Sequence, residues 1–469
     1  MVKNADGGKN LKKLLSTIIP VHNKADTLPR VIDCLRAQDF PAHQVEIIFV
    51  ADQCTDGSLD VLRSVQENGE TQLLEVATGG GSAAKARNIG LDASAGLYCL
   101  FLDPDIIIPP DFFSKVVSHL TLSKHTACMS PVYGNSNSLS TWPFIVQDHT
   151  AWLTMTNEEV LRWAAYQERL KDIRIKFTVS THGSLDHLAA PWVFCWSSAL
   201  AVERKLLVRV GGFNSTFRFK GSEDLELGYR LHSVNARFKL MLDTCVFHMP
   251  QDRNRELEES IDRQHEREML RLHPTHETEA LCAFDGAHAN PMLNLLSGLD
   301  AQKIGEQASA WEFPVNLENL NLPTNFQLII GFAPTWLINS NEIRYIACPH
   351  SQLADKKIPL FGFALPFEDK AFRGAALVGL WQLLPEPLAC RIIDEAIRVA
   401  NEVYILKISH SQIPMPIWAY EAINSHDHPY WERTQRVRRS FFDFNLIPVG
   451  QDGPIYSFTV SRATGDIRK

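Results

Sequence analysis

The sequence has no long apolar run and no paired cysteines. No stretch approaches the roughly 18 consecutive apolar residues that a membrane-spanning helix needs. The N-terminal stretch MVKNADGGKNLKKLLSTIIPVHN is polar and then basic, without the apolar core and cleavage site of a signal peptide. The nine cysteines form no C-x-x-C pair, which is typical of reduced thiols rather than of a disulfide framework. We therefore expect a cytoplasmic protein without a transmembrane segment, while a peripheral membrane contact stays open.

An excess of positive charge is also missing. The 46 Lys and Arg residues against 54 Asp and Glu give a net charge of -8, with an isoelectric point of about 6.1. A dedicated nucleic-acid-binding protein usually has a basic face, so the composition argues against that class. The short cluster RVRRS at 436–440 could contact a phosphate, but a solvated helix face is the simpler interpretation.

The chain does have a globular composition and a regular alternation of strand and helix patterns. Its 469 residues, 45% hydrophobic and 21% charged, are enough for two or three domains. Short apolar runs rich in β-branched residues predict strands, and apolar residues at helical spacing between them predict helices. The expected strands are 14–21, 45–52, 71–78 and 97–103, with helices in 27–40, 54–68 and 83–94. This alternation predicts an α/β fold with a parallel sheet, whose ligands bind beyond the carboxyl ends of the strands.

Two carboxylates stand directly behind the fourth expected strand, in the sequence LYCLFLDPDIIIPPDFF. Asp103 and Asp105 flank a proline there, and Asp52 ends the second expected strand, so all three belong to one edge of the sheet. Paired carboxylates supply the oxygen ligands that Mg²⁺ and Mn²⁺ prefer beside phosphate oxygens. Taken alone, a D-x-D sequence is weak, because Asp-Pro also starts ordinary turns.

Other polar residues have both an ordinary and a functional interpretation. Lys85 and Arg87 precede the fourth strand and could meet a diphosphate, or they could lie on a solvated helix face. The adjacent acids Glu223 and Asp224 begin an expected helix, where the helix dipole favours acids whatever the function. His248 ends an expected strand and could be a third metal ligand, although a single histidine there is more often structural.

Taken together, the segments from Leu15 to about Pro274 resemble the family 2 nucleotide-sugar glycosyltransferases of GT-A fold, in the branch with a galactosyltransferase-like C-terminal segment. The matching segments are STIIPVHNKADTLPRVIDCL, IIFVADQCTDGS, AKARNIGL, LYCLFLDPDIIIPPDFF, VGGFNSTFRFKGSEDLELGYRL and FHMPQDR. Their order over more than half of the chain makes the combination specific. The resemblance implies a Rossmann-like domain with a mostly parallel sheet.

The resemblance also implies a role for each candidate residue. Asp103 and Asp105, with His248, are expected to hold Mn²⁺ or Mg²⁺ on the donor diphosphate. Asp224 is expected to be the catalytic base, and Glu223 to orient the acceptor, in an attack that inverts the anomeric carbon. The residues expected to bind the donor are Pro20, Asp52, Lys85, Arg87 and Asp103.

Two tryptophans and an acid are expected on the acceptor side. Trp192 and Trp196 could stack on a sugar face beside Glu223, and core packing is the expected fate of at least one of them. They follow an irregular segment, residues 142–190, which is either an acceptor-side insertion or a capping subdomain without chemistry. The loop ADQC departs from the two acids followed by Gly-Ser that many relatives have, so the preferred base stays open, with a UDP-linked sugar expected first.

The last part of the chain resembles a class I S-adenosylmethionine-dependent methyltransferase without its cofactor chemistry. The segments IPLFGFALPFEDKAFRGAALVGL, RIIDEAIRVANEVYILKIS and IYSFTVSR resemble the second half of that fold, including its closing antiparallel hairpin. The glycine-rich turn is reduced to Gly331, IRYIACPH lacks the expected ribose-binding acid, and Phe372-Arg373 replaces the usual Phe-Asp. We therefore expect a degenerate domain for docking, dimerisation or acceptor recognition.

These interpretations combine into one expected architecture. The GT-A domain is expected over residues 1–285, a linker over 286–322 and a second Rossmann-like, methyltransferase-related α/β domain over 323–469. The expected function is sugar transfer from a nucleotide-diphosphate donor to a glycan, small molecule or peptide, without nucleic-acid partners. The alternatives are a bifunctional glycosyltransferase and methyltransferase, or a non-catalytic scaffold with a transferase fold. A homodimer formed through the C-terminal domain is also possible.

Overall fold

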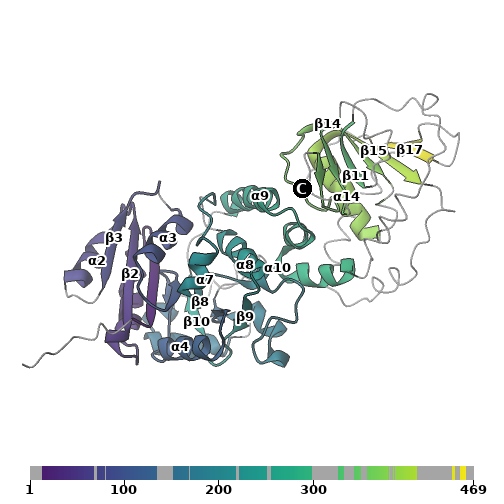
Figure 1. Cartoon of the computed structure of the whole chain (residues 1–469). Helices are drawn as coiled ribbons and strands as arrows, with labels where there is room; N and C mark the ends of the chain where they lie inside the picture. Colours follow the sequence, from purple (N-terminus) through teal and green to yellow (C-terminus); the bar gives the residue numbers. More distant parts are fainter. Residues whose placement is uncertain are drawn as a thin grey trace, which may run out of the picture. The chain divides into compact units, whose positions relative to one another are not determined.

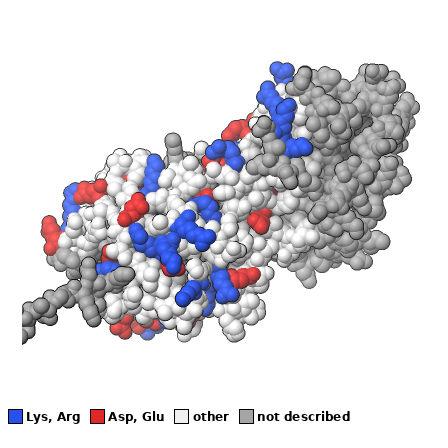
Figure 2. Space-filling view, viewed as in Figure 1, with Lys and Arg blue, Asp and Glu red and all other residues white. Residues whose placement is uncertain are grey.

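The computed structural model divides into two compact units, Met1–His265 and Glu266–Lys469. It describes residues 13–67, 71–79, 81–134, 151–167, 170–217, 221–250, 255–297, 326–331, 343–349, 356–378, 380, 384, 386–408, 446–448 and 455–460. Among these residues, no helix is both long enough and apolar enough to cross a membrane. Figure 2 shows charges of both signs on one face of the first unit, with basic side chains gathered near its middle.

A seven-stranded mixed sheet forms the centre of the first unit, in the order β3-β2-β1-β4-β8-β6-β9 (Figure 1). Its strands are β1 (Leu15–Val21), β2 (Val45–Asp52), β3 (Gln72–Val76), β4 (Tyr98–Leu102), β6 (Thr126–Met129), β8 (Ala199–Glu203) and β9 (Arg237–Leu240). β1 pairs in parallel with β2 and β4, and β2 with β3, as expected from the βαβ pattern. β8 runs antiparallel to its neighbours β4 and β6. The expected mostly parallel sheet is therefore confirmed, with β8 reversed.

Six helices accompany this sheet in the described part of the chain. They are α1 (Leu28–Arg36), α2 (Ser58–Glu67), α3 (Ala83–Ala93), α4 (Phe112–Leu122), α7 (Arg204–Arg209) and α8 (Glu223–Ser233). Of these, α1, α2, α3 and α8 lie where the sequence predicted them. α1 buries Leu28, Val31, Ile32 and Leu35, the residues whose helical spacing predicted it. β1 is buried along its whole length, which fits a mostly apolar sequence without alternation, although Ser16 and Thr17 are buried in it too.

A small second sheet carries His248, the expected third metal ligand. It is made of β5 (Ile106–Ile107), β10 (Val246–His248) and β7 (Val132–Tyr133), in the order β5-β10-β7. β10 runs antiparallel to β5, with His248 opposite Ile106. Because β5 directly follows the D-x-D sequence, this register brings His248 to Asp105.

The segment before β8 is a compact, mostly irregular region. It contains α6 (Asn157–Ala165) and short 3-10 turns at Ala151–Thr154, Ile173–Phe177, Val179–Thr181 and Pro191–Phe194. Within the sequence NEEVLRWAAYQERLKDI, the helix α6 ends at Ala165. Residues 142–150 of the expected insertion lie outside the described residues.

The second unit is built on another seven-stranded sheet, in the order β13-β12-β11-β14-β15-β17-β16. Its strands are β11 (Phe326–Gly331), β12 (Tyr345–Ala347), β13 (Lys357–Ile358), β14 (Phe372–Val378), β15 (Ala400–Ile408), β16 (Leu446–Pro448) and β17 (Ile455–Val460). The strands β11 to β15 pair in parallel, whereas β17 is antiparallel to β15 and β16. α14 (Glu386–Val399) packs on β14 and β15. The predicted α/β second domain with a closing hairpin is therefore present, whereas its methyltransferase relation stays a prediction.

Two helices lie around the predicted domain boundary. The division between the units falls within α9 (Arg255–Leu272), and α10 (His276–Ser297) belongs to the second unit. Residues 286–297 of the expected linker are therefore helical, and residues 298–322 lie outside the described residues. The boundaries at 285 and 323 stay a prediction.

Candidate functional site

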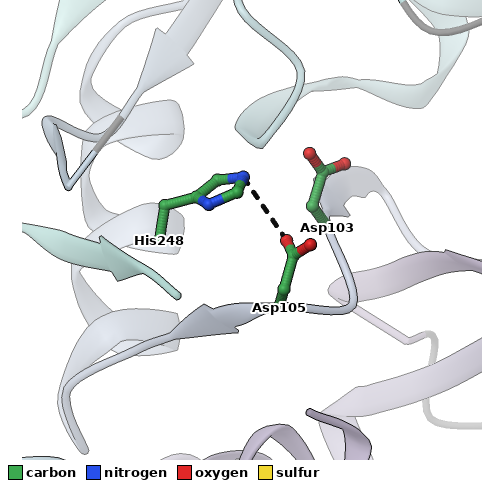
Figure 3. A group of neighbouring side chains, drawn as sticks. All are labelled: Asp103, Asp105 and His248. Carbon is green, nitrogen blue, oxygen red and sulfur yellow. Dashed lines mark ion pairs between the residues drawn. The ribbon is translucent and has the colours of Figure 1, made fainter. Parts of the chain in front are cut away.

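Three expected metal ligands meet at the carboxyl end of β4. Atoms of Asp103, Asp105 and His248 that could bind a metal all lie within 4.8 Å of one another. Figure 3 shows the two carboxylates and the imidazole directed into the same space, with His248 Nε2 3.5 Å from Asp105 Oδ1. Octahedral metal–ligand distances of about 2.1 Å place ligand atoms about 3 to 4.2 Å apart, so a small adjustment would let one divalent ion reach all three.

The chemistry of this donor set suits a divalent cation. Asp103 and Asp105 are 5% and 1% exposed, so their charges lie in a region of low dielectric. His248 Nδ1 lies 3.0 Å from the carbonyl oxygen of Met249, which fits a donating Nδ1–H and turns the Nε2 lone pair toward the carboxylates. The Met249 amide in turn donates to the backbone oxygen of Asp105 at 2.9 Å, which fixes the two strands together. Two carboxylates and one neutral imidazole can therefore hold Mn²⁺ or Mg²⁺ here.

Lys24 also contacts the metal ligands, although the sequence analysis did not single it out. Its Nζ lies 3.0 Å from Asp105 Oδ2, on the side of the carboxylate away from His248. It belongs to the loop between β1 and α1, which reaches the same edge of the sheet. A lysine three residues after the end of the first strand was the available signal.

Arg87 links Asp103, a candidate metal ligand, to Glu223 at the start of α8. Its Nη2 donates to Asp103 at 2.9 Å and its Nη1 donates to Glu223 at 2.8 Å. Burial acts to lower the pKa of Arg87, but the two carboxylates raise it above its usual value. The guanidinium lies 5.2 Å from the ring centroid of Phe213. In this conformation Arg87 therefore holds protein carboxylates, where the sequence suggested a diphosphate partner.

The loop before α8 is fixed against α3. Asn88 donates from its side-chain amide to the Phe213 carbonyl at 2.8 Å and accepts from the Phe213 amide at 2.8 Å. Gly212 has a φ of 67°, and a Cβ there would lie 2.5 Å from the Asn88 side-chain oxygen. The glycine is therefore required for this close approach, which places Phe213 against Arg87.

Glu223 and Asp224 stand at the start of α8 with different partners. Glu223 is 2% exposed, and its Oε1 and Oε2 accept from Arg87 and from the Gly221 amide. Asp224 is half-buried and accepts from the Ser197 amide at 3.0 Å. Burial and the Glu223 carboxylate raise the pKa of Asp224 to about 6. Asp224 is the more accessible of the two acids, and its raised pKa suits a general base.

The donor-side acid Asp52 is held by a residue that the sequence did not reveal. Thr78 donates to Asp52 Oδ1 from its amide at 2.8 Å and to Oδ2 from its hydroxyl at 2.6 Å. Lys85 Nζ donates to the Thr78 carbonyl at 3.1 Å, and Gln53 accepts from the Gly79 amide at 3.1 Å. These contacts join the carboxyl ends of β2 and β3 into one surface. Pro20 lies buried in β1, paired with Val50.

The two tryptophans have different environments. Trp192 is fully buried, 5.2 Å from Tyr229 between ring centroids, so the expectation that one tryptophan packs in the core is met by Trp192. It presents no face to an acceptor in this conformation. Trp196 is half-buried, and the Arg174 guanidinium lies 4.2 Å from its ring centroid. Trp196 thus remains a candidate for acceptor binding.

A buried ion pair that the sequence did not indicate anchors the Trp196 region. Arg174 and Asp172 are both fully enclosed, and Arg174 Nη2 lies 2.6 Å from Asp172 Oδ2. Arg174 also donates to the backbone oxygens of Phe194 and Ser130, at 3.0 and 2.8 Å. The pair therefore ties the insertion to the strands beside the site. Nothing in the irregular sequence around it distinguishes this arginine from a surface residue.

Comparison with known proteins relates part of the first unit to a known family. Residues 16–182 match the family described as "Glycosyl transferase family 2". The validoxylamine A glucosyltransferase of Streptomyces hygroscopicus subsp. jinggangensis (strain 5008) is 26% identical over 244 residues, 52% of this chain and 57% of that protein. The chondroitin synthase of Escherichia coli is 25% identical over 238 residues, 50% of this chain and 34% of that protein.

Solved structures resemble the chain more distantly. TarS 1-349 of S. aureus in complex with UDP-GlcNAc matches with a TM-score of 0.39 and 14% identity, covering 58% of this chain and 71% of that one. The chain spans about half the length of the first curated relative, at 57%, and a smaller share of the second, at 34%. The family match covers Asp103 and Asp105, whereas Glu223, Asp224 and His248 lie beyond it. Residues 16–182 of this chain are therefore similar to glycosyltransferase family 2.

Proposed function

We propose that this chain is a metal-dependent glycosyltransferase that moves a sugar from a nucleotide-diphosphate donor to an acceptor nucleophile, with inversion. The observation that carries the proposal is the convergence of Asp103, Asp105 and His248, whose ligand atoms lie within 4.8 Å of one another. The match of residues 16–182 to the family supports the reaction class. A UDP-linked sugar is the expected donor, and a glycan, small molecule or peptide the expected acceptor.

The residues of the site divide into two groups. A divalent ion held by Asp103, Asp105 and His248 would offset the negative charge of the departing diphosphate. On the other side of Arg87, Asp224 would take the proton of the acceptor hydroxyl as that oxygen attacks the anomeric carbon. Glu223 would hold Arg87 in place between the two groups.

A donor screen with the full-length chain tests this proposal. A UDP-sugar that binds the folded protein should raise the melting temperature in the presence of Mn²⁺. The same mixture should release UDP, and Asp105→Ala should reduce that release by about 100-fold or more, as loss of a metal ligand requires. Asp111→Asn, at an exposed acid paired with Lys115, is the matched control and should behave as wild type. Unchanged turnover in Asp105→Ala would reject the metal-dependent mechanism.

We also propose that the second unit is a degenerate methyltransferase-like domain without cofactor chemistry. The parallel sheet closed by antiparallel β17 supports the relation, and Gly331, with a φ of 110°, is the glycine left at the end of β11. Calorimetry with S-adenosylmethionine distinguishes this from a bifunctional enzyme. Absence of binding heat is expected, and saturable binding would favour the bifunctional alternative.

A further inference from the structure

We infer that Lys24 is a diphosphate-binding residue that leaves Asp105 when a metal and the donor bind together. This inference rests on the proposed function of the same site. The starting observation is the 3.0 Å contact between Lys24 Nζ and Asp105 Oδ2, beside a buried cluster of candidate metal ligands. The lysine ammonium thus sits where a divalent cation would compete for the same carboxylate.

The backbone around Lys24 is fixed, so a change of position concerns the side chain alone. The Lys24 amide donates to Ser58 Oγ at 2.7 Å, and the next amide, of Ala25, donates to Asp56 Oδ2 at 3.0 Å. The Thr27 hydroxyl donates to the Pro104 carbonyl at 2.8 Å, which ties the loop to the D-x-D sequence. The flexible four-carbon stem of a lysine lets its ammonium change partners from such an anchored backbone.

Arg87 provides the contrast within the same cluster. Both Arg87 and its two carboxylate partners are almost fully buried, and the guanidinium is held at two points. Lys24 contacts the carboxylate of Asp105 at a single point, and its side chain is 19% exposed. The Arg87 guanidinium is therefore fixed between its two carboxylates, whereas the Lys24 ammonium can reach solvent from its present position.

The charges of the site give a reason for the exchange. A divalent ion on Asp105 repels an ammonium at this distance, so Lys24 disfavours the metal when it binds alone. A donor diphosphate beside the metal offers the ammonium a new anionic partner on the same edge of the sheet. Lys24 then opposes binding of the free metal and favours binding of the nucleotide to the metal-loaded site. The result is a positive coupling between metal and donor.

Binding measurements with Mn²⁺ and UDP test this coupling without use of activity. In Lys24→Met, which keeps the length of the side chain and removes its charge, Mn²⁺ alone should bind about tenfold more tightly. UDP should bind the Mn²⁺-saturated variant about tenfold more weakly than it binds the wild type. Titrations followed by the Mn²⁺ paramagnetic resonance signal and by calorimetry give both affinities. Shifts of the two affinities in the same direction, or no shift in either, would overturn the inference.

Two further variants separate charge from packing. Lys24→Arg keeps the charge and should retain the wild-type order of affinities, and behaviour like that of Lys24→Met would overturn the inference. Lys205→Met removes the charge of a lysine that is 74% exposed and paired with Glu203, and it should leave both affinities unchanged. If the wild type itself fails to bind Mn²⁺ and UDP, the proposed function fails. If the wild type binds both and Lys24→Met leaves both affinities unchanged, the inference about Lys24 fails and the proposed function stands.

Discussion

Both carboxylate oxygens of Asp52 accept hydrogen bonds from Thr78, one from its amide at 2.8 Å and one from its hydroxyl at 2.6 Å. The acid at the end of β2 is therefore held in one orientation by the segment that follows β3. A nucleotide base that approaches Asp52 meets a preorganised carboxylate rather than a rotating one.

The first prediction follows from that contact. Thr78→Val removes the hydroxyl donor, so Asp52 loses one of its two fixed bonds, and UDP affinity should fall about threefold to tenfold. Thr78→Ser keeps a hydroxyl and should bind UDP like the wild type. Calorimetric titration with UDP and Mn²⁺ measures both variants. Equal losses in the two would show that the hydroxyl is not what orients Asp52.

The second prediction concerns the pH dependence of turnover. A base with a pKa of about 6 is active when deprotonated, so the rate should be level above that pH and fall about tenfold per unit below it. Asp224→Asn should lower the rate by about 10²-fold to 10⁴-fold and remove this acidic limb. Asp60→Asn, at an exposed acid in the first turn of α2, should keep both the rate and the limb. A limb that persists in Asp224→Asn would assign it to another group.

The third prediction concerns the stability that Arg87 provides. In Arg87→Lys a single ammonium cannot donate to Asp103 and to Glu223 at the same time. One of these buried carboxylates therefore loses a charge-assisted hydrogen bond, which should lower the free energy of unfolding by about 1.5 to 3 kcal/mol. Denaturant unfolding measures the loss. Arg63→Lys alters an arginine–carboxylate pair of the same kind, with Glu75, whose side chains are 51% and 46% exposed. That control should change stability by less than about 0.5 kcal/mol. Equal effects in both would contradict the role of burial.

The fourth prediction separates the two tryptophans. Trp192→Leu leaves a cavity in the core and should lower the free energy of unfolding by about 3 kcal/mol. Trp196→Leu removes a half-buried ring beside Arg174 and should mainly raise the KM for the acceptor, once an acceptor is known. Melting curves and steady-state kinetics on both variants give the comparison. A normal acceptor KM in Trp196→Leu would exclude this ring from the acceptor site.

The fifth prediction belongs to the second unit. Glu279 on α10 accepts hydrogen bonds from the amides of Phe361, Gly362 and Phe363 at 2.7 to 2.8 Å. Glu279→Ala leaves these buried donors unpaired, at about 1 to 3 kcal/mol each, so the second unit should melt well before the first. Glu277→Ala, a partly exposed acid on the same helix, is the control and should melt like the wild type. Differential scanning calorimetry resolves the two transitions.

The sequence was informative where local patterns carry the structure. Alternating apolar runs predicted β1 to β4 and the helices between them, since burial of a strand or helix face leaves a periodic signal. Acids at strand ends predicted that Asp103 and Asp105 lie at the ligand-binding edge of the sheet. The expectation that His248 joins them came from the family resemblance, and the three side chains do lie together.

The contacts that the sequence did not predict depend on tertiary packing. The direction in which Arg87 points, toward Glu223 rather than toward solvent, is decided by residues more than 100 positions away. The burial of Arg174 and the bond from Thr78 to Asp52 likewise follow from how distant segments meet. No periodicity marks such a contact, so a single sequence leaves its partner undetermined.

The antiparallel pairing of β10 with β5 has a consequence for the order of events during synthesis. Asp105 and His248 are 143 positions apart in the numbering, 248 minus 105. At about 5 to 20 residues per second, the ribosome adds that stretch in about 7 to 29 seconds. The two acids of the D-x-D sequence therefore exist for that time without their histidine. Asp103, Asp105 and His248 come together only after β10 has emerged, so a metal ion could meet all three side chains only at that late stage of synthesis.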